Sequence, residues 1–297
     1  MTTYDFVAAN KRKTVLLVLL FLVFIMGLGW ALDYAYGAGG GFIFIAGAYS
    51  TVTALVSYYS GDKIALRATG ARPVTETENP YLVRMVQNLC ITIGSPQPKV
   101  YVIDDPTINA FATGRDPEHA SIAVTTGAIQ KLANEELEGV LAHELSHIRN
   151  YDIRVMTIVI VLVGTVVILS DLIFRSTFFF GRRRDDRHGG NGLMLIVGLI
   201  LMILAPIVAQ LIQLAVSRKR EYLADASGAL ITRFPEGLAR ALRKIAAESQ
   251  PMARASGATA HLFFASPFTG RALAGLFSTH PPIEARIEAL NRMSNPT

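Results

Sequence analysis

The sequence of 297 residues contains a single cysteine and few charged residues. One cysteine, Cys90, excludes a disulfide framework and every zinc or iron–sulfur site built from several cysteines, so a bound metal would need His, Asp or Glu ligands. Charged residues make up 17% of the chain, against about a quarter in typical soluble proteins, while 51% of the residues are hydrophobic. This composition predicts a membrane protein with room for one modest domain outside the bilayer.

The net charge of +5 does not by itself indicate a nucleic-acid-binding protein. The sequence contains no recognisable nucleic-acid-binding module, and basic residues beside hydrophobic runs are typical of membrane proteins. We therefore expect the lipid bilayer, and no nucleic acid, among the partners.

Four apolar stretches organise the chain. Val15–Leu32 is an uncharged run of 18 residues that follows three basic residues at 11–13, and Phe42–Ser60 is a second uncharged run. The first run exceeds the length of a signal-peptide core and lacks a cleavage site after it, so we expect an uncleaved anchor paired with the second run in a transmembrane hairpin. Val155–Phe174 and Leu193–Val216 are also apolar but contain polar residues, and they are expected to form a second hairpin.

The basic amino terminus predicts that the residues before the first span, and those after the first hairpin, lie in the cytoplasm. The Arg-rich loop 175–192 would then lie outside, against the positive-inside rule, which leaves the depth of the second hairpin open. We expect a multi-pass protein of the inner (plasma) membrane.

This pattern divides the chain into four parts. The first hairpin occupies 1–61, and a second transmembrane or membrane-associated hairpin occupies 153–216. Two more polar parts, 62–152 and 217–297, are expected to form one cytoplasmic domain that the second hairpin interrupts.

Short strands are expected in the first polar part. Lys99–Ile103, Ile108–Thr113 and Ser121–Val124 have strand-like composition, with Gly114–Glu118 as the turn between the last two, while Tyr81–Leu89 has helical spacing. The expected fold class is a mainly α membrane protein with four transmembrane helices and an α+β domain that contains a small antiparallel sheet.

The residues with the most distinctive chemistry lie on a predicted helix with Asn134 as its N-cap. His143 and His147 are four residues apart, so their imidazoles lie one above the other on one face, which is the geometry that two ligands of one metal ion need. In such a His-Glu-x-x-His motif the histidines bind zinc, and Glu144 is placed to take a proton from a water molecule.

A catalytic zinc ion usually has three protein ligands and one open position. Glu221 and Asp225 are four residues apart on another predicted helix, so we expect Glu221 to be the third ligand and Asp225 to orient a ligand histidine. The alternative is a solvated helix face with a salt bridge to Arg218. The histidines that would compete as third ligand have no supporting partner in the sequence: His119, His188 and His261.

Substrate contacts are expected along one of the predicted strands. If the segment from Asn109 to Thr113 is an exposed edge strand, an extended peptide would pair with it and contact Asn109, Ala110 and Phe111. An edge strand that is merely covered by a loop agrees equally well with the sequence.

The residues near the carboxyl terminus leave two readings open. His280 or Arg286 is a candidate for holding the carbonyl oxyanion of the substrate. In the alternative, Pro281 and Pro282 start a helix and His280 packs beside it. Asp152 is expected to stabilise the join between the metal-binding helix and the third apolar stretch.

The segments 143–150 and 220–225, together with Thr279-His280-Pro281-Pro282, resemble the HtpX-type membrane zinc metalloproteases, which are relatives of the CAAX prenyl proteases. The resemblance extends over nearly the whole chain, including Asn109-Ala110-Phe111. It implies a zincin-type catalytic domain, one Zn²⁺ per chain and cleavage of misfolded or membrane proteins at the cytoplasmic face, in quality control under stress. It also implies the site residues: His143, His147 and Glu221 as ligands and Glu144 as catalytic base.

Two other functions stay open at this point. One is a dedicated processing protease of the CAAX type, against which the small number of apolar stretches argues. The other is a metal-binding membrane scaffold without catalytic activity, which would have no need of a carboxylate at Glu144.

Overall fold

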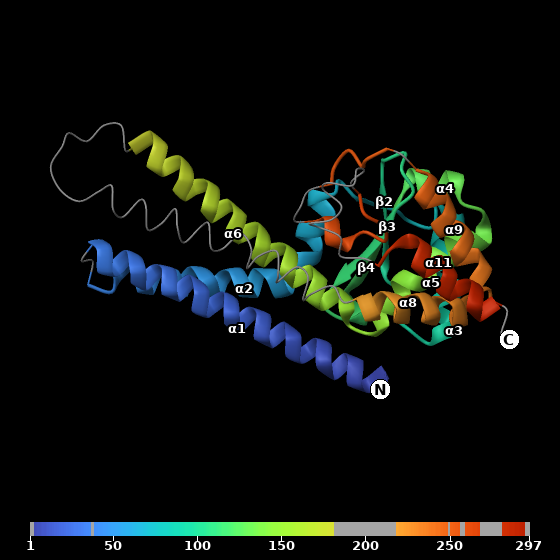
Figure 1. The fold of residues 1–297 in the computed structure, drawn as a ribbon, viewed down its shortest axis with the longest axis horizontal. Coiled ribbons are helices and arrows are strands. Elements are labelled where there is room, and N and C mark those ends of the chain that lie inside the picture. The colour runs from blue at the N-terminus through green and yellow to red at the C-terminus, as the bar shows by residue number, and fades with distance from the viewer. Residues whose placement is uncertain are drawn as a thin grey trace.

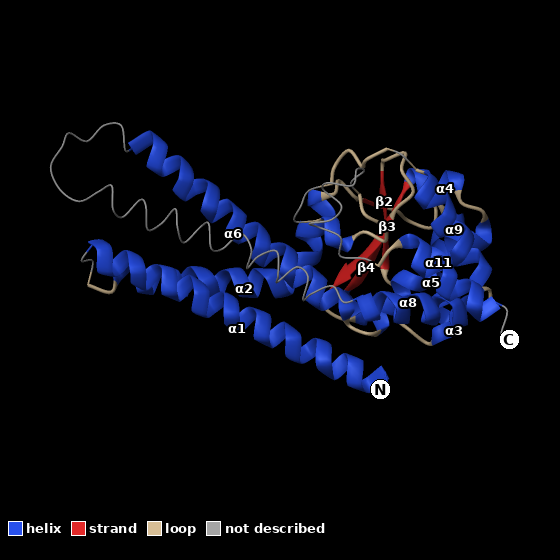
Figure 2. Cartoon of the chain, viewed as in Figure 1, coloured by secondary structure: helices blue, strands red, loops and turns tan. Residues whose placement is uncertain are grey.

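The structure is a computed structural model that describes residues 3–36, 39–180, 218–248, 250–255, 259–267 and 281–294. These residues are mainly helical, as expected, and Figure 2 shows the helices around one small sheet.

Three long helices run side by side away from the part that holds the sheet (Figure 1). They are α1 (Thr3–Tyr36), α2 (Gly41–Ala68) and α6 (Asp152–Phe180). Apolar side chains join them, among them Phe21 of α1 and Leu162 of α6.

Two of these helices are long and apolar enough to cross a membrane, at Val7–Tyr34 and Gly41–Ala68. Their outward side chains include exposed apolar residues such as Val23 and Phe44, which suit contact with lipid. The two apolar runs of the first predicted hairpin therefore lie on two helices of suitable length, while their crossing of a membrane stays a prediction. The third apolar stretch lies within α6, whereas the fourth, Leu193–Val216, lies outside the described residues, so the predicted number of four spans is not confirmed.

The sheet has four strands in the order β1-β2-β4-β3. Their bounds are Arg72–Pro73, Lys99–Ile103, Ala110–Gly114 and Ala120–Thr125 for β1, β2, β3 and β4. β2 and β4 are parallel, while the other two pairs are antiparallel. The expectation of an antiparallel sheet is therefore wrong, although the predicted β3–β4 hairpin is present.

A local turn lies in the connection between β2 and β3. After β2, the backbone N–H and the hydroxyl of Thr107 both donate to Oδ1 of Asp105, at 3.0 and 2.6 Å. After this turn, β3 lies on the far side of β4 rather than beside β2. All six residues of β4 are buried, which suits a central strand, and β3 is left at the edge.

Six further helices complete this part of the chain among the described residues. They are α3 (Pro80–Ile93), α4 (Thr126–Lys131), α5 (Asn134–Arg149), α8 (Arg218–Thr232), α9 (Pro235–Ala247) and α11 (Ile283–Ser294). Two short 3₁₀ helices, η1 (Pro117–His119) and η3 (Ala260–Leu262), lie in connections. α5 is central, since it contacts α3, α8, α9 and β3, and 12 of its 16 residues are buried.

The start of α5 differs from the predicted capping. Asn134 is the first helical residue, and its side chain accepts a hydrogen bond from the hydroxyl of Tyr81 instead of capping the helix. The backbone N–H of Ala133 is satisfied by the carboxylate of Glu136 at 2.8 Å. Glu136 takes this role because a carboxylate at the third helical position reaches back to the N-cap residue.

Candidate metal centre

Three buried side chains from two helices converge at the centre of the domain. His143 and His147 come from α5 and Glu221 comes from α8, and one ligand atom from each lies within 4.8 Å of the others. The two Nε2 atoms are 3.0 Å apart, and the carboxylate oxygens of Glu221 lie 3.8 Å from Nε2 of His143 and 3.5 Å from Nε2 of His147. The fold therefore brings together the three residues that the sequence analysis grouped as metal ligands.

Each imidazole is oriented by a carboxylate at its other nitrogen. Nδ1 of His143 lies 2.9 Å from Oδ1 of Asp225, and Nδ1 of His147 lies 3.0 Å from Oδ2 of Asp152. When a neutral imidazole carries its proton on Nδ1, beside the carboxylate, its lone pair is on Nε2, the atom that faces the cluster in both rings.

The two histidines have opposite pKa shifts. Burial lowers the pKa of His143 to about 4, although Asp225 acts in the other direction. Burial also acts to lower the pKa of His147, but its hydrogen bond to Asp152 and the charge of Glu221 outweigh burial and raise the pKa to about 9. The carboxylates around His147 thus favour a positive charge at this point.

The charge of the cluster suits a divalent cation. With both imidazoles neutral, three ionised carboxylates and Glu144, whose pKa is raised to about 7, face two buried guanidinium groups, which leaves one to two negative charges that a proton on His147 offsets when no metal ion is bound. These groups belong to Glu144, Asp152, Glu221, Asp225, Arg220 and Arg286. Buried charges of one sign are costly unless they are paired or bind a metal. The two nitrogen donors and one carboxylate are also the ligand types that zinc prefers.

Glu144 lies beside the cluster on α5. Its side chain is buried, and burial raises the pKa of the carboxyl group to about 7, while the backbone N–H of Ala112 in β3 donates to it. A carboxylate whose pKa lies near neutrality can both accept and return a proton.

Arg286 of α11 joins the site through Asp225. Its Nε and Nη2 atoms lie 2.8 and 2.7 Å from the two oxygens of Asp225, in a bidentate pair. Burial acts to raise the pKa of Asp225, but Arg286 and His143 hold it at about 2. The ionised Asp225 therefore contacts both the imidazole of His143 and the guanidinium group of Arg286. Glu221 and Asp225 are both buried, so the alternative of a solvated helix face is wrong.

The edge of β3 that does not pair with β4 is partly covered by another segment of the chain. The backbone N–H of Phe264 donates to the carbonyl of Ala110 at 2.8 Å. The side-chain amide of Asn109 donates to the carbonyl of Ala265 at 3.1 Å and accepts from its N–H at 3.2 Å. The ring of Phe264 lies edge-on to His143, with 4.8 Å between centroids. Here, the predicted edge strand exists and a loop covers part of it.

The other candidates lie in different places. Phe111 is fully buried against Phe263, so its ring belongs to the core rather than to an open surface. Arg286 binds Asp225 and also donates to the carbonyl of Phe264 at 3.2 Å. His280, His188 and residues 181–192 of the Arg-rich loop lie outside the described residues, while 175–180 belong to α6. His119 is exposed beside Asp116, and His261 is buried near the carbonyl of Met156.

Sequence reasoning missed two neighbours of the ligands. Asp152 was assigned only to the join between helices, but its carboxylate also holds His147. Its position five residues after the second histidine, directly beyond the end of the helix, is a signal that would have identified it. Phe264 gives no comparable signal, since only the tertiary fold brings it to His143.

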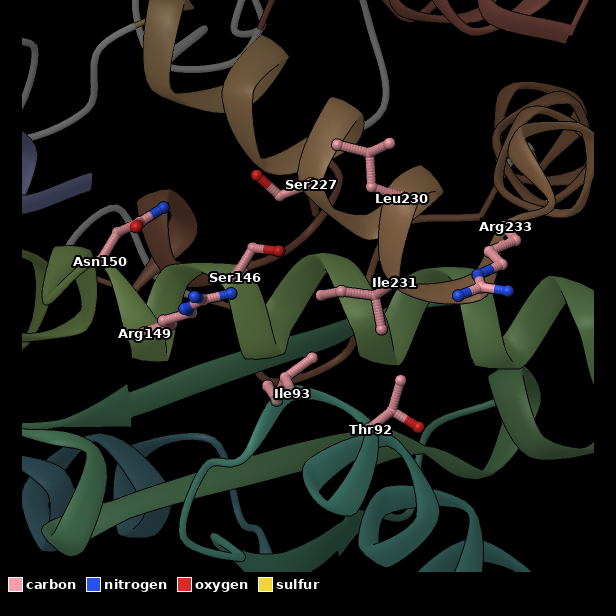
Figure 3. Close-up of a pocket in the computed structure, with 9 residues that line it drawn as sticks. All are labelled: Thr92, Ile93, Ser146, Arg149, Asn150, Ser227, Leu230, Ile231 and Arg233. Atoms are coloured by element: carbon pink, nitrogen blue, oxygen red, sulfur yellow. The ribbon is translucent and has the colours of Figure 1, made fainter. Parts of the chain in front are cut away.

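A separate cavity of about 530 Å³ lies between the ends of α3, α5 and α8. Figure 3 shows Ser146 and Arg149 on α5 and Ser227 and Leu230 on α8 around it. Its lining shares no residue with the cluster of His143, His147 and Glu221.

Comparisons with known proteins agree on one family. A sequence profile described as peptidase family M48 matches residues 76–294. Proteins called "Protease HtpX homolog" from Tropheryma whipplei (strain Twist) and Caldanaerobacter subterraneus are 45% and 46% identical to the chain. These matches cover 98% and 99% of the chain, and 99% and 98% of the relatives.

One solved structure also resembles the chain. The crystal structure of S. mikatae Ste24p matches with a TM-score of 0.51 at 16% identity, over 97% of this chain and 67% of that one. At this identity the likeness concerns the fold alone.

Proposed function

Because the chain belongs to peptidase family M48 and is a membrane metalloprotease, we propose that zinc is its metal, held by His143, His147 and Glu221. The observation that carries this proposal is the convergence of the three ligand atoms within 4.8 Å. The carboxylates on both Nδ1 atoms support it, since they direct both Nε2 lone pairs to one point. One Zn²⁺ per chain is expected.

When bound, zinc would polarise the carbonyl of the scissile peptide bond and make a water molecule more acidic. Glu144 is the proposed catalytic base. Its carboxylate takes the proton of the attacking water and then delivers that proton to the leaving amine. The pKa raised by burial to about 7 suits both transfers, because the group changes protonation state near neutral pH.

Asp225 and Asp152 keep the imidazoles in place during this cycle. Because Asp152 accepts a hydrogen bond from Nδ1 of His147, this ring cannot turn away from the metal position without losing a buried bond, which costs about 1–3 kcal/mol. The carboxylate of Asp225 lies 2.9 Å from Nδ1 of His143 and pairs with it. Arg286 compensates the charge of Asp225.

We further propose that an extended substrate pairs with the edge of β3. At this edge the carbonyl of Ala110 already accepts from the backbone N–H of Phe264, and the side-chain amide of Asn109 binds the backbone of Ala265. Substrate would therefore have to replace this segment at the edge. Recognition of backbone atoms rather than side chains suits the cleavage of varied unfolded or membrane proteins, which are the proposed substrates.

The proposed role is quality control of membrane proteins under stress, at the cytoplasmic face of the inner membrane. In this proposal, 1–61 and 153–216 form the membrane hairpins, and 62–152 and 217–297 form one cytoplasmic catalytic domain. The HtpX-named relatives support the role, and the basic residues at 11–13 support the orientation.

Replacement of Glu144 by Gln tests the proposed catalysis. The detergent-purified Glu144→Gln protein is expected to retain one zinc ion per chain and to lose at least about 99% of its cleavage of casein, because loss of a general base typically costs about 10²–10⁴-fold in rate. Glu138→Gln, the same change on the same helix away from the cluster, is the matched control and should cleave at the parent rate. Cleavage by Glu144→Gln at the rate of the control would refute the role of Glu144.

A further inference from the structure

A hydrogen-bond network connects the first membrane helix to the proposed metal site. Asn10 of α1 is buried, and its side-chain amide donates to Oδ1 of Asp152 at 2.7 Å. Asp152 in turn holds Nδ1 of His147 through Oδ2 at 3.0 Å. One residue therefore separates an amide of the membrane helix from a proposed zinc ligand.

The amide of Asn10 is engaged on every side. Its second N–H donates to the carbonyl of Asn150 at 2.8 Å, and its oxygen accepts from Nη1 of Arg220 at 3.2 Å. The same nitrogen of Arg220 lies 3.0 Å from Oδ1 of Asp152. Because Asn10 and Arg220 both bind Oδ1, the other oxygen of Asp152 is turned to His147. Arg220 directly precedes Glu221, so the network reaches both helices that carry the ligands.

The backbone that places Asp152 is itself strained. Tyr151, between α5 and α6, has a φ of 60°, a left-handed conformation that non-glycine residues seldom adopt. The ammonium group of Lys11, next to Asn10 on α1, lies 4.9 Å from the centre of the Tyr151 ring. α1 thus contacts the three consecutive residues 150–152 of this turn, and it helps hold the conformation that brings Asp152 to His147.

We propose that Asn10 is a positioning residue for the metal site, through which helix α1 fixes the orientation of Asp152 and His147. This inference rests on the proposed function in that it takes His147 as a metal ligand. A link of this kind makes the affinity for the metal depend on how α1 packs against the domain.

Asn10→Leu tests the link, because leucine has a similar size and no hydrogen-bonding group. Removal of an outer partner of a ligand histidine typically weakens metal binding by about 10–100-fold; since Asn10 acts through Asp152, we expect about tenfold weaker zinc binding, measured by chelator competition on the full-length protein in detergent. The absorption bands of the cobalt-substituted protein should shift as well, since they respond to the ligand geometry.

Thr14→Val is the matched control. Thr14 is buried one turn further along α1, and its hydroxyl donates to the carbonyl of Asn10 within the same helix, at 3.0 Å. This variant should leave the zinc affinity and the cobalt spectrum unchanged. If both variants weaken zinc binding equally, Asn10 is only a packing residue and the inference is wrong.

An exchange of the two side chains adds a test that does not require Asn10→Leu to fold. Asn10→Asp alone would place two carboxylates together at the position of the 2.7 Å bond and should weaken zinc binding. Adding Asp152→Asn restores one amide and one carboxylate at this contact, so the double variant should recover zinc affinity relative to Asn10→Asp.

The outcomes separate this inference from the proposed function. Unchanged zinc affinity and cobalt spectrum in Asn10→Leu, or no recovery in the exchange, would overturn the positioning role even if the parent protein cleaves casein. A parent protein that binds zinc but does not cleave would instead refute the proposed function, while the effect of Asn10 on zinc affinity would still be measured.

Discussion

Arg286 has no exposed surface, and its charge is balanced by Asp225 at the centre of the molecule. Removing one member of a buried ion pair leaves the other charge without compensation, which typically costs about 3–5 kcal/mol. We expect Arg286→Met to lower the free energy of unfolding by this amount and to weaken zinc binding, because the freed Asp225 no longer has a fixed position beside His143. Thermal unfolding in detergent, with zinc present, measures the first effect.

Arg292→Met is the control for this prediction. Arg292 lies on the same helix and pairs with Glu288, but both side chains are largely exposed, and such pairs contribute at most about 1 kcal/mol. Equal stability of the two variants would contradict the structural role of Arg286. Direct contact of Arg286 with the substrate oxyanion stays a prediction.

At the scale of residues, the sequence best predicted the relative positions of site residues that lie close together in the chain. His143, His147 and Glu144 lie on one helix, so their relative positions follow from the helical repeat alone. Asp152 depends on the left-handed turn at Tyr151, and Phe264 reaches His143 only through the tertiary fold. No local pattern encodes the contact of Phe264, whereas the position of Asp152 just beyond the helix is a local signal that depends on this turn.

At the scale of elements, α8 must approach α5 closely for Glu221 to reach both histidines. Gly228 allows this approach: a Cβ atom at this position would lie 3.0 Å from the backbone nitrogen of His143. We expect Gly228→Ala to separate the helices, to cost about 1–3 kcal/mol of stability and to weaken zinc binding, as measured by thermal unfolding and chelator competition.

Gly164→Ala is the matched control, because a Cβ atom there would have no neighbour within 4 Å among the described residues. This variant should bind zinc as the parent does. If Gly228→Ala also behaves like the parent, the close contact between α5 and α8 is not required for the site.

For the sheet, the sequence predicted where the strands lie in the chain but not the order in which they pair. The positions of β2, β3 and β4 followed from composition, but their order did not, because strand order depends on pairing between residues far apart in the sequence. The length of the connection between β2 and β3 does not show whether the two strands pair with each other or lie on opposite sides of β4. β1, with only two residues, was too short to predict.

At the scale of the whole molecule, the ligands come from two parts of the chain separated by residues 153–216. These parts can share a metal only if the chain crosses the membrane an even number of times between them. We therefore expect Thr77 and Glu284, exposed positions in the two parts, to lie on the same, cytoplasmic side, and Gly41, at the start of α2, to lie on the other side.

Cysteine labelling in intact cells measures this topology, since Cys90 is the only native cysteine and can be replaced by Ala. A maleimide that does not cross membranes should label Gly41→Cys, whereas Thr77→Cys and Glu284→Cys should react only after the cells are opened. Labelling of Thr77→Cys and Glu284→Cys from opposite sides would be incompatible with one shared metal site.

The zinc content of the detergent-purified protein, with and without Glu221→Ala, tests the central claim most directly. The parent protein and a Glu138→Ala control should each bind one zinc ion tightly, and Glu221→Ala should bind zinc far more weakly in chelator competition, because two histidines alone leave the ion without its third protein ligand. Unchanged zinc stoichiometry and affinity in Glu221→Ala would contradict the assignment of the metal site.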